Sequence, residues 1–161
     1  QLWSGSPLPL VVDASALGWL VPQASSPDAI RVLTPHPGEA ARLLETTAQT
    51  VQADRPAALR ELSRRFGGCW IVLKGHQTLV GRSEGDIFVN PSGNAHLAQG
   101  GSGDALGGFL AGLLAQPELQ ADVGKTIRYA VWQHGATADD LQARRTNWVV
   151  EDLVGGLGNR G

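Results

Sequence analysis

Residues 98–114 read AQGGSGDALGGFLAGLL, a glycine-rich turn that runs directly into an apolar helix. Three of the four residues 100–103 are glycines, which take backbone dihedrals closed to other residues and let a ligand approach closely. We expect the helix to cover 103–114. Its free N–H groups and the positive end of its dipole then converge on the turn. The stretch therefore predicts an anion site, most often one for phosphate.

Asp104 falls in the first turn of this helix, beside the expected anion. A carboxylate there repels phosphate, and removing a proton from a substrate hydroxyl at the transferring phosphoryl group would explain its presence. Two plainer interpretations stay open. Asp104 can cap the helix, and the glycines can serve tight packing alone. The stretch matches neither the P-loop, which ends in Gly-Lys-Ser/Thr, nor a strand-borne GxGxxG.

Composition describes a globular chain of 161 residues, 42% hydrophobic and 17% charged, which is one domain or a large part of a bigger one. A formal net charge of -2 gives no hint of nucleic acid or of an anionic membrane. The single cysteine, Cys69, lies in an apolar run, which indicates a buried thiol and excludes an internal disulfide. Without a spanning segment or a signal pattern, we expect a cytoplasmic location.

Chemistry-bearing residues follow two expected strands at their carboxyl ends, where open α/β sheets place ligands. Strand 8–12 is followed by Asp13, which either contacts a ligand or caps the next turn. Strand 30–34 is followed by His36, held extended between two prolines before a helix. His36 is either a ligand contact or an ordinary exposed or structural histidine.

A third strand is expected at 69–73, an unbroken apolar run typical of a strand buried on both faces. Lys74, beside Gly75, is then placed to reach a phosphate, although a surface lysine is the alternative. Residues 79–80 and 87–89 flank a hairpin.

Three further helices complete the expected pattern. One begins after Asp54 and ends at a Gly-Gly pair, and one covers 122–141 with His134 packed in its apolar stripe. The last covers 149–157 with Asn147 as its cap. Such βα units predict an open, mostly parallel α/β sheet with helices on both faces, and a phosphate-binding enzyme.

Three sequence blocks resemble the ribokinase-like NAD(P)H-hydrate dehydratase family. They are LTPHPGE at 33–39, VLKG at 72–75, and GN followed by GGSGD within 93–104. VVDA upstream and AVWQHG downstream extend the resemblance over nearly the whole chain. It implies one ribokinase-like domain over 1–161, a three-layer α/β/α fold with a mostly parallel central sheet. Because family domains run to about 270 residues, we expect the N-terminal part to be lacking.

The resemblance also implies an activity, the repair of NADH or NADPH whose nicotinamide ring has been hydrated. Family members use ADP in most bacteria and archaea and ATP in eukaryotes, with Mg²⁺ bridging phosphate oxygens. Hydrated NAD(P)H and a nucleotide are then the partners, without nucleic acid or membrane, and a homo-oligomer such as a dimer or tetramer is compatible with the family.

Carried over residue by residue, the resemblance implies a site with no metal-ligating side chain. Asp104 would be the catalytic base at the reacting hydroxyl. Substrate-binding residues would be Asp13, His36, Asn94 and Asp104. Nucleotide-binding residues would be Lys74, Gly75, His76, Gln77, Thr78, Gly101, Ser102 and Gly103. The chain departs from the family pattern at Ser15, where an Asp is usual, and at His76 and Gln77, which replace smaller residues.

Two alternatives remain beside the dehydratase. Hydroxymethylpyrimidine or hydroxyethylthiazole kinases share the fold and the Gly-Asp helix start, although the His-Pro-Gly-Glu block favours the dehydratase. A catalytically inactive nucleotide-binding fragment is the second alternative. Nucleotide affinity without turnover would support it.

Overall fold

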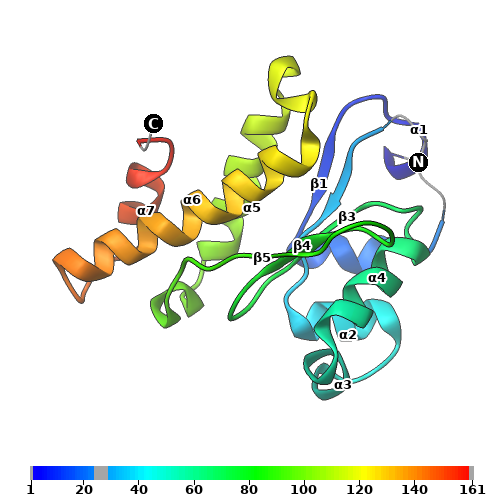
Figure 1. The fold of residues 1–161 in the computed structure, drawn as a ribbon, viewed down its shortest axis with the longest axis horizontal. Helices are drawn as coiled ribbons and strands as arrows, with labels where there is room; N and C mark the ends of the chain where they lie inside the picture. The colour runs from blue at the N-terminus through cyan, green and yellow to red at the C-terminus, as the bar shows by residue number, and fades with distance from the viewer. Residues whose placement is uncertain (1, 24–28, 160–161) are drawn as a thin grey trace. The chain divides into compact units, whose positions relative to one another are not determined.

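The computed structural model describes residues 2–23 and 29–159, and it divides the chain into two compact units, Gln1–Val89 and Asn90–Gly161 (Figure 1). The first unit holds a sheet with the strand order β1-β2-β3-β4-β5. The strands are β1 (Leu10–Val12), β2 (Arg31–Leu33), β3 (Trp70–Leu73), β4 (Leu79–Gly81) and β5 (Phe88–Val89). All three predicted single strands and the predicted hairpin are present.

The sheet is mixed. Strands β1, β2 and β3 are parallel, with Val11 opposite Val32 and Leu33 opposite Ile71. Strands β3, β4 and β5 are antiparallel, with Leu73 opposite Leu79. The hairpin arises because the segment between β4 and β5 is too short for a crossover helix, which a parallel pair requires.

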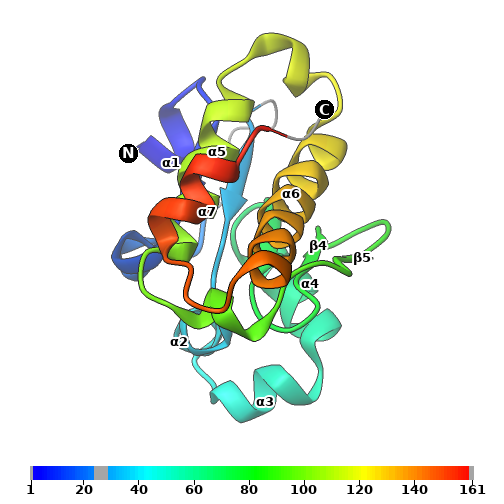
Figure 2. The same cartoon turned by 90° about the vertical axis from the view of Figure 1, so that its left-hand side faces the viewer.

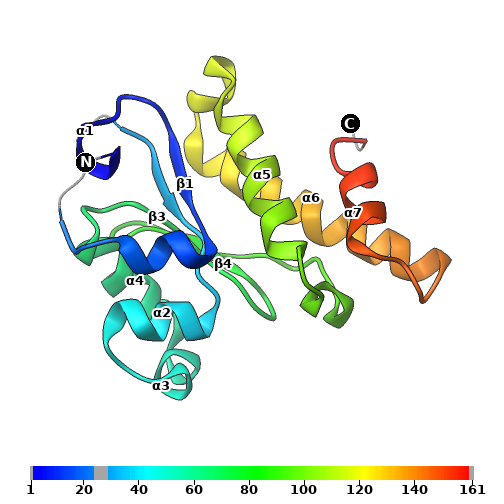
Figure 3. The same cartoon turned by 180° about the vertical axis from the view of Figure 1, so that it is seen from behind.

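Helices of the first unit lie along the sheet, and Figure 3 shows α2, α3 and α4 together. The helical segments are α1 (Leu2–Gly5), the 3₁₀ segment η1 (Ala14–Trp19), α2 (Pro37–Leu44), α3 (Ala48–Ala53) and α4 (Arg55–Arg65). The predicted Asp54 cap of α4 is confirmed, because its Oδ1 accepts the N–H of Ala57 at 3.0 Å. The apolar faces of these helices form one core with the strands. The core includes Leu33, Ile71, Leu73, Val51, Leu59, Leu62 and Phe66.

Arg31 is a buried arginine at the start of β2. Its Nε donates to the Trp3 carbonyl at 2.6 Å, and Nη1 donates to that of Leu8 at 2.9 Å. Burial lowers the pKa of Arg31 from its ordinary value. Carbonyl oxygens thus compensate a cation taken out of water, and they fasten the N-terminal segment to the sheet.

Cys69 is buried as predicted, and desolvation raises the pKa of its thiol from 9.0 to about 12. We expect a thiol reagent to label Cys69 only when the first unit unfolds, because the reactive thiolate is excluded from the folded state. The thiol ionises more readily in the unfolded chain than in the folded one. Its raised pKa therefore makes the folded state less stable as the pH rises from 9 toward 12. Labelling against urea concentration measures the first effect. Rapid labelling under native conditions would contradict it, and Cys69→Ala is the blank.

The second unit is helical. In Figure 2 its chain runs from green through yellow to red, and α5 lies in the yellow-green part. Its segments are η2 (Ala95–Ala98), α5 (Ser102–Leu114), η3 (Pro117–Gln120), α6 (Val123–Arg144) and α7 (Val150–Gly156). Helices α5, α6 and α7 contact one another in pairs. His134 lies on the buried face of α6, as predicted.

The prediction that Asn147 caps the last helix is wrong. Helix α7 begins at Val150 with Val149 in the cap position, and the Val149 N–H donates to Asp152 Oδ2 at 2.9 Å. This hydrogen bond lowers the pKa of Asp152. Asn147 is two residues too early to cap, because a capping side chain must belong to the residue that flanks the first helical turn.

No helix within residues 2–23 and 29–159 combines the length and the apolar character needed to cross a bilayer.

Candidate active site

The glycine turn before α5 has the geometry of an anion site. Helix α5 begins at Ser102, one residue earlier than predicted, and Gly101 occupies the cap position with φ 84°. That left-handed conformation explains the glycine. The N–H groups of Gly103 and Asp104 fall in the first turn of the helix, where no intrahelical carbonyl can accept them. They and the helix dipole therefore converge on the turn.

Asp104 is exposed in the first turn of α5. The alternative that it caps the helix is wrong, because Gly101 takes the cap position and has no side chain. Its carboxylate forms no hydrogen bond or ion pair with another of the described residues. The carboxylate belongs to the same helical turn as the free N–H groups of Gly103 and Asp104. Because it is exposed, it can contact a ligand that binds there.

His134 fixes the beginning of α5 from α6. Its Nε2 lies 3.0 Å from the Ser102 carbonyl oxygen and 3.3 Å from Ser102 Oγ, and both residues are buried. The ring therefore holds the residue that leads into the anion-binding turn. The sequence predicted the burial of His134 but not this contact, because the partner is 32 positions away.

Asn94 lies in a loop that α6 also holds. The Asp139 carboxylate accepts the Gly93 N–H at 2.8 Å and the Asn94 Nδ2–H at 3.0 Å. Asn94 Oδ1 accepts the N–H of His96 at 3.0 Å, so both ends of the amide have internal partners. One Nδ2 hydrogen remains for a ligand. Sequence reasoning missed Asp139, which no local pattern marks.

His36 caps α2. Its Nδ1 accepts the N–H groups of Gly38 at 3.0 Å and Glu39 at 3.3 Å, and Glu39 Oε2 accepts the His36 N–H at 2.8 Å. This reciprocal arrangement is a capping box. The ring proton then sits on Nε2, which is 3.5 Å from Glu39 Oε1. The side chain is 54% exposed, so Nε2 remains accessible.

Asp13 and Lys74, predicted to bind substrate and nucleotide, lie together. Lys74 Nζ donates to Asp13 Oδ1 at 2.6 Å, with both side chains mostly buried. Asp13 makes no capping hydrogen bond to η1, so the capping alternative is wrong. The carboxyl ends of β1 and β3 thus present an ion pair, which is where a parallel sheet brings such ends together.

The turn after Lys74 exposes backbone N–H groups. Gly75 has φ 135° and Gln77 has φ 55°, while the Thr78 hydroxyl donates to the Gly75 carbonyl at 3.1 Å. Residues Gly75, His76 and Gln77 are exposed. Their N–H groups form no hydrogen bond with the described residues. Free N–H groups of successive residues in a turn can bind an anion.

Arg55 contacts this turn from the start of α4, and its position in that helix is a signal that sequence reasoning overlooked. A basic residue in the first helical turn opposes the helix dipole, so its position asks for a separate reason. It lies between the cap Asp54 and Pro56.

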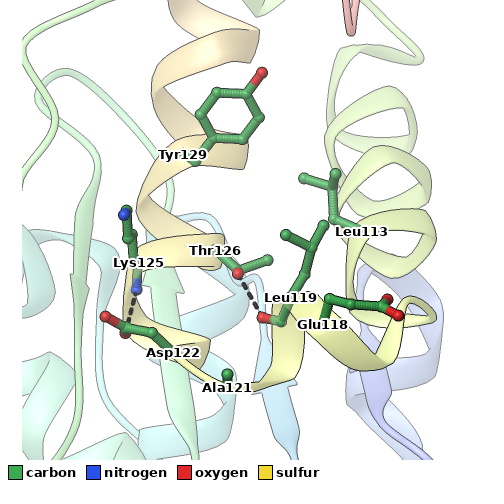
Figure 4. A pocket seen from close by; sticks show the side chains of 8 residues that line it. All are labelled: Leu113, Glu118, Leu119, Ala121, Asp122, Lys125, Thr126 and Tyr129. Atoms are coloured by element: carbon green, nitrogen blue, oxygen red, sulfur yellow. Dashed lines mark hydrogen bonds between the residues drawn. The ribbon is translucent and has the colours of Figure 1, made fainter.

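A hollow of about 380 Å³ lies at the other end of α5 and contains none of the predicted site residues. Figure 4 shows Leu113 and Leu119 reaching toward it, with the Thr126 hydroxyl bonded to the Leu119 carbonyl. Leu113 is about 16 Å along the helix from Ser102, at 1.5 Å per residue. The hollow is therefore separate from the anion-binding turn.

Within the described residues, no group of three or more His, Cys, Asp or Glu side chains is arranged to hold a metal ion.

The family model described as NAD(P)H-hydrate dehydratase matches residues 4–154. The chain belongs to this family. It is 49% identical over 141 residues to the ADP-dependent (S)-NAD(P)H-hydrate dehydratase of Neisseria meningitidis serogroup B. The aligned region covers 83% of this chain and 46% of that protein. It is 45% identical over 139 residues to the bifunctional NAD(P)H-hydrate repair enzyme Nnr of Vibrio cholerae, covering 86% and 27%. The chain thus spans about half or less of these relatives.

Solved structures of similar proteins have the same fold. The ADP/ATP-dependent NAD(P)H-hydrate dehydratase of Bacillus subtilis, co-crystallised with ATP/Mg²⁺ and soaked with CoA, has a TM-score of 0.82 at 29% identity and covers 98% of this chain and 57% of its own. A ribokinase-like superfamily protein of Enterococcus faecalis has a TM-score of 0.74 at 29% identity, covering 94% and 51%. The predicted ribokinase-like α/β fold is confirmed.

Proposed function

We propose that the protein is a nucleotide-dependent dehydratase that returns hydrated NADH or NADPH to NAD(P)H, with ADP or ATP as phosphoryl donor. The observation that carries the proposal is the glycine turn at the start of α5, with Asp104 exposed in its first turn. Membership of the dehydratase family supports the substrate. Both nucleotides stay in the proposal because relatives are named ADP-dependent and ADP/ATP-dependent.

Asp104 is the proposed general base. It takes the proton of the ring hydroxyl, and that oxygen attacks the terminal phosphoryl group while the bond to the shortened nucleotide breaks. The new phosphate ester then leaves as inorganic phosphate: the ring C–O bond breaks, the adjacent ring carbon loses a proton to solvent, and the double bond is restored. The N–H groups of Gly103 and Asp104 stabilise the negative charge that develops on the transferring group.

The turn 74–78 is the proposed seat of the remaining nucleotide phosphates, with Lys74 as its cation. Lys74 meets Asp13 in the absence of a ligand, so phosphate binding requires the ammonium to be shared or exchanged. Gly101 and Ser102 are also proposed to bind the nucleotide. His36 and Asp13 are proposed for the substrate. Asn94, whose amide has one hydrogen left for a ligand, is likewise proposed to bind the substrate.

Mg²⁺ fits this proposal as an ion carried by the nucleotide. Magnesium is usually held by one or two carboxylates together with substrate phosphates, rather than by an all-protein cage. The described residues form no such cage, so the nucleotide phosphates, rather than a side chain of the protein, would hold the ion. When bound, the ion would neutralise charge on the phosphate oxygens.

The proposal treats the chain as one ribokinase-like domain that acts in the cytoplasm on small molecules. The net charge of -2 gives no electrostatic reason for a nucleic-acid or anionic-membrane partner. A homo-oligomer is compatible with the proposal.

The direct test mixes the protein with hydrated NADH, Mg²⁺ and either ADP or ATP and follows the return of NADH absorbance. Recovery with at least one nucleotide, and none without it, is the expected result. Nucleotide binding without recovery would reject the dehydratase in favour of a nucleotide-binding fragment. Phosphorylation of a hydroxymethylpyrimidine or hydroxyethylthiazole alcohol instead would identify a kinase.

Lys74→Ala is expected to weaken ADP and ATP binding about tenfold or more, because a hydrogen bond to a charged group contributes about 1.5–3 kcal/mol. Calorimetric titration measures the loss. The matched control is Lys125→Ala, the only other lysine of the chain, which lines the hollow at the far end of α5. Equal affinities for Lys74→Ala and the wild type would refute the assignment.

A further inference from the structure

We infer that Arg55 is a positioning residue for the nucleotide phosphates, because its guanidinium holds the turn after β3 with backbone N–H groups facing outward. This inference rests on the proposed function of that turn. Arg55 Nη2 donates to the Leu73 carbonyl at 2.9 Å and to the Lys74 carbonyl at 3.4 Å. Its Nη1 donates to the His76 carbonyl. One planar side chain thus holds three backbone carbonyls between positions 73 and 76.

These contacts decide which way the peptide units of the turn point. The structure has no cis peptide bonds among its described residues, so the C=O and N–H of each unit point in opposite directions. When the Lys74 carbonyl faces Arg55, the Gly75 N–H faces away. When the His76 carbonyl faces Arg55, the Gln77 N–H faces away. The clamp therefore creates the two outward donors that an anion would meet.

The charge of Arg55 adds to this geometry. Its hydrogen-bond partners are neutral carbonyls, and no carboxylate among the described residues forms an ion pair with it. Burial lowers the pKa of Arg55 from its ordinary value, but a guanidinium stays protonated in proteins. An uncompensated cation beneath two outward N–H groups favours an anionic ligand. It also gives a reason for a basic residue at a position where the dipole of α4 disfavours one.

Arg60 provides a matched control on the same helix. Its Nη1 donates to the Ser83 carbonyl at 2.9 Å, and its Nη2 donates to the Gly85 carbonyl at 3.0 Å. The clamp has the same chemistry but acts on the loop between β4 and β5. Arg60→Ala thus removes a comparable set of hydrogen bonds without touching the turn 74–77.

The experiment is a calorimetric titration of ADP and ATP with Mg²⁺ onto the wild-type chain and the variants Arg55→Ala, Arg55→Lys and Arg60→Ala. We expect Arg55→Ala to raise Kd about tenfold or more and Arg60→Ala to leave it unchanged, with similar losses of Tm. Arg55→Lys keeps the charge but cannot bridge separate carbonyls, so its Kd should lie between those of the wild type and Arg55→Ala. In the turnover assay, Arg55→Ala should raise the KM for nucleotide with kcat nearly unchanged.

Two results would overturn the inference alone: wild-type affinity in Arg55→Ala, or equal weakening in Arg60→Ala. A wild-type chain that binds neither nucleotide would overturn the proposed function and this inference together. That outcome is visible in the first titration, before any variant is compared.

Discussion

Asp104→Asn is expected to lower the turnover of hydrated NADH by about 10²–10⁴-fold, the usual contribution of a general base. Asparagine keeps the shape of the side chain but cannot accept the proton of the ring hydroxyl. Because the carboxylate is exposed and the cap position belongs to Gly101, the fold should be unaffected. Steady-state kinetics should therefore show a loss in kcat, while calorimetry shows nearly unchanged nucleotide affinity.

Asp122→Asn is the control for the same chemical change elsewhere. Asp122 caps α6, with its Oδ1 accepting the Lys125 N–H at 2.9 Å, and asparagine caps equally well. We expect full turnover and an unchanged Tm for this variant. If Asp104→Asn turns over at the wild-type rate, or fails to fold while Asp122→Asn folds, Asp104 is not the catalytic base.

Gly135→Ala is expected to destabilise the second unit by about 1–3 kcal/mol, the usual cost of an overpacked contact. A Cβ at this position of α6 would lie 2.4 Å from Ser92 Oγ and 2.7 Å from the Ser92 carbonyl carbon and oxygen. Helix propensity alone predicts the opposite sign, since alanine is favoured over glycine by about 1 kcal/mol in a helix interior. The backbone clash therefore decides. Urea unfolding followed by circular dichroism measures the difference.

Gly108→Ala and Gly112→Ala are the matched controls, because both glycines lie in α5 and a Cβ there meets nothing within 4 Å. These variants should be neutral or more stable than the wild type. A gain in stability for Gly135→Ala like that of the controls would contradict the predicted clash with Ser92.

The elements that could be predicted from the sequence are those whose pattern is local. The apolar run at 69–73, the Asp54 cap and the glycine turn at 101–103 each carry their signal within a few residues, and each is present. Helix α3 (Ala48–Ala53) was missed because its sequence, AQTVQA, offers one large apolar residue and no periodic face. The prediction that Asn147 caps the last helix was wrong. Asparagine favours cap positions in general, but here Asp152 accepts the Val149 N–H at the start of the helix.

The sequence suggested candidate site residues, and their assignment stays a prediction; it could not suggest the contacts that these residues make. Asp13 and Lys74 were chosen separately as ligands, yet they pair across 61 positions. Asp139 and Arg55 were missed because their roles consist of bonds to backbone atoms distant in sequence. Spacing along the chain determines which face of an element a side chain occupies. It does not determine which distant carbonyl or N–H lies opposite.

The capping box at α2 divides the His36 ring into an inner and an outer half. Its inner nitrogen has its lone pair committed to the N–H groups of Gly38 and Glu39, while its outer nitrogen carries the only ring proton. A ligand thus meets a hydrogen-bond donor and no acceptor. Such a ring selects ligands by their hydrogen-bonding groups, because it can donate to a carbonyl or phosphate oxygen but cannot accept a hydrogen bond from an amino group. This selectivity follows from the role of the ring as a helix cap.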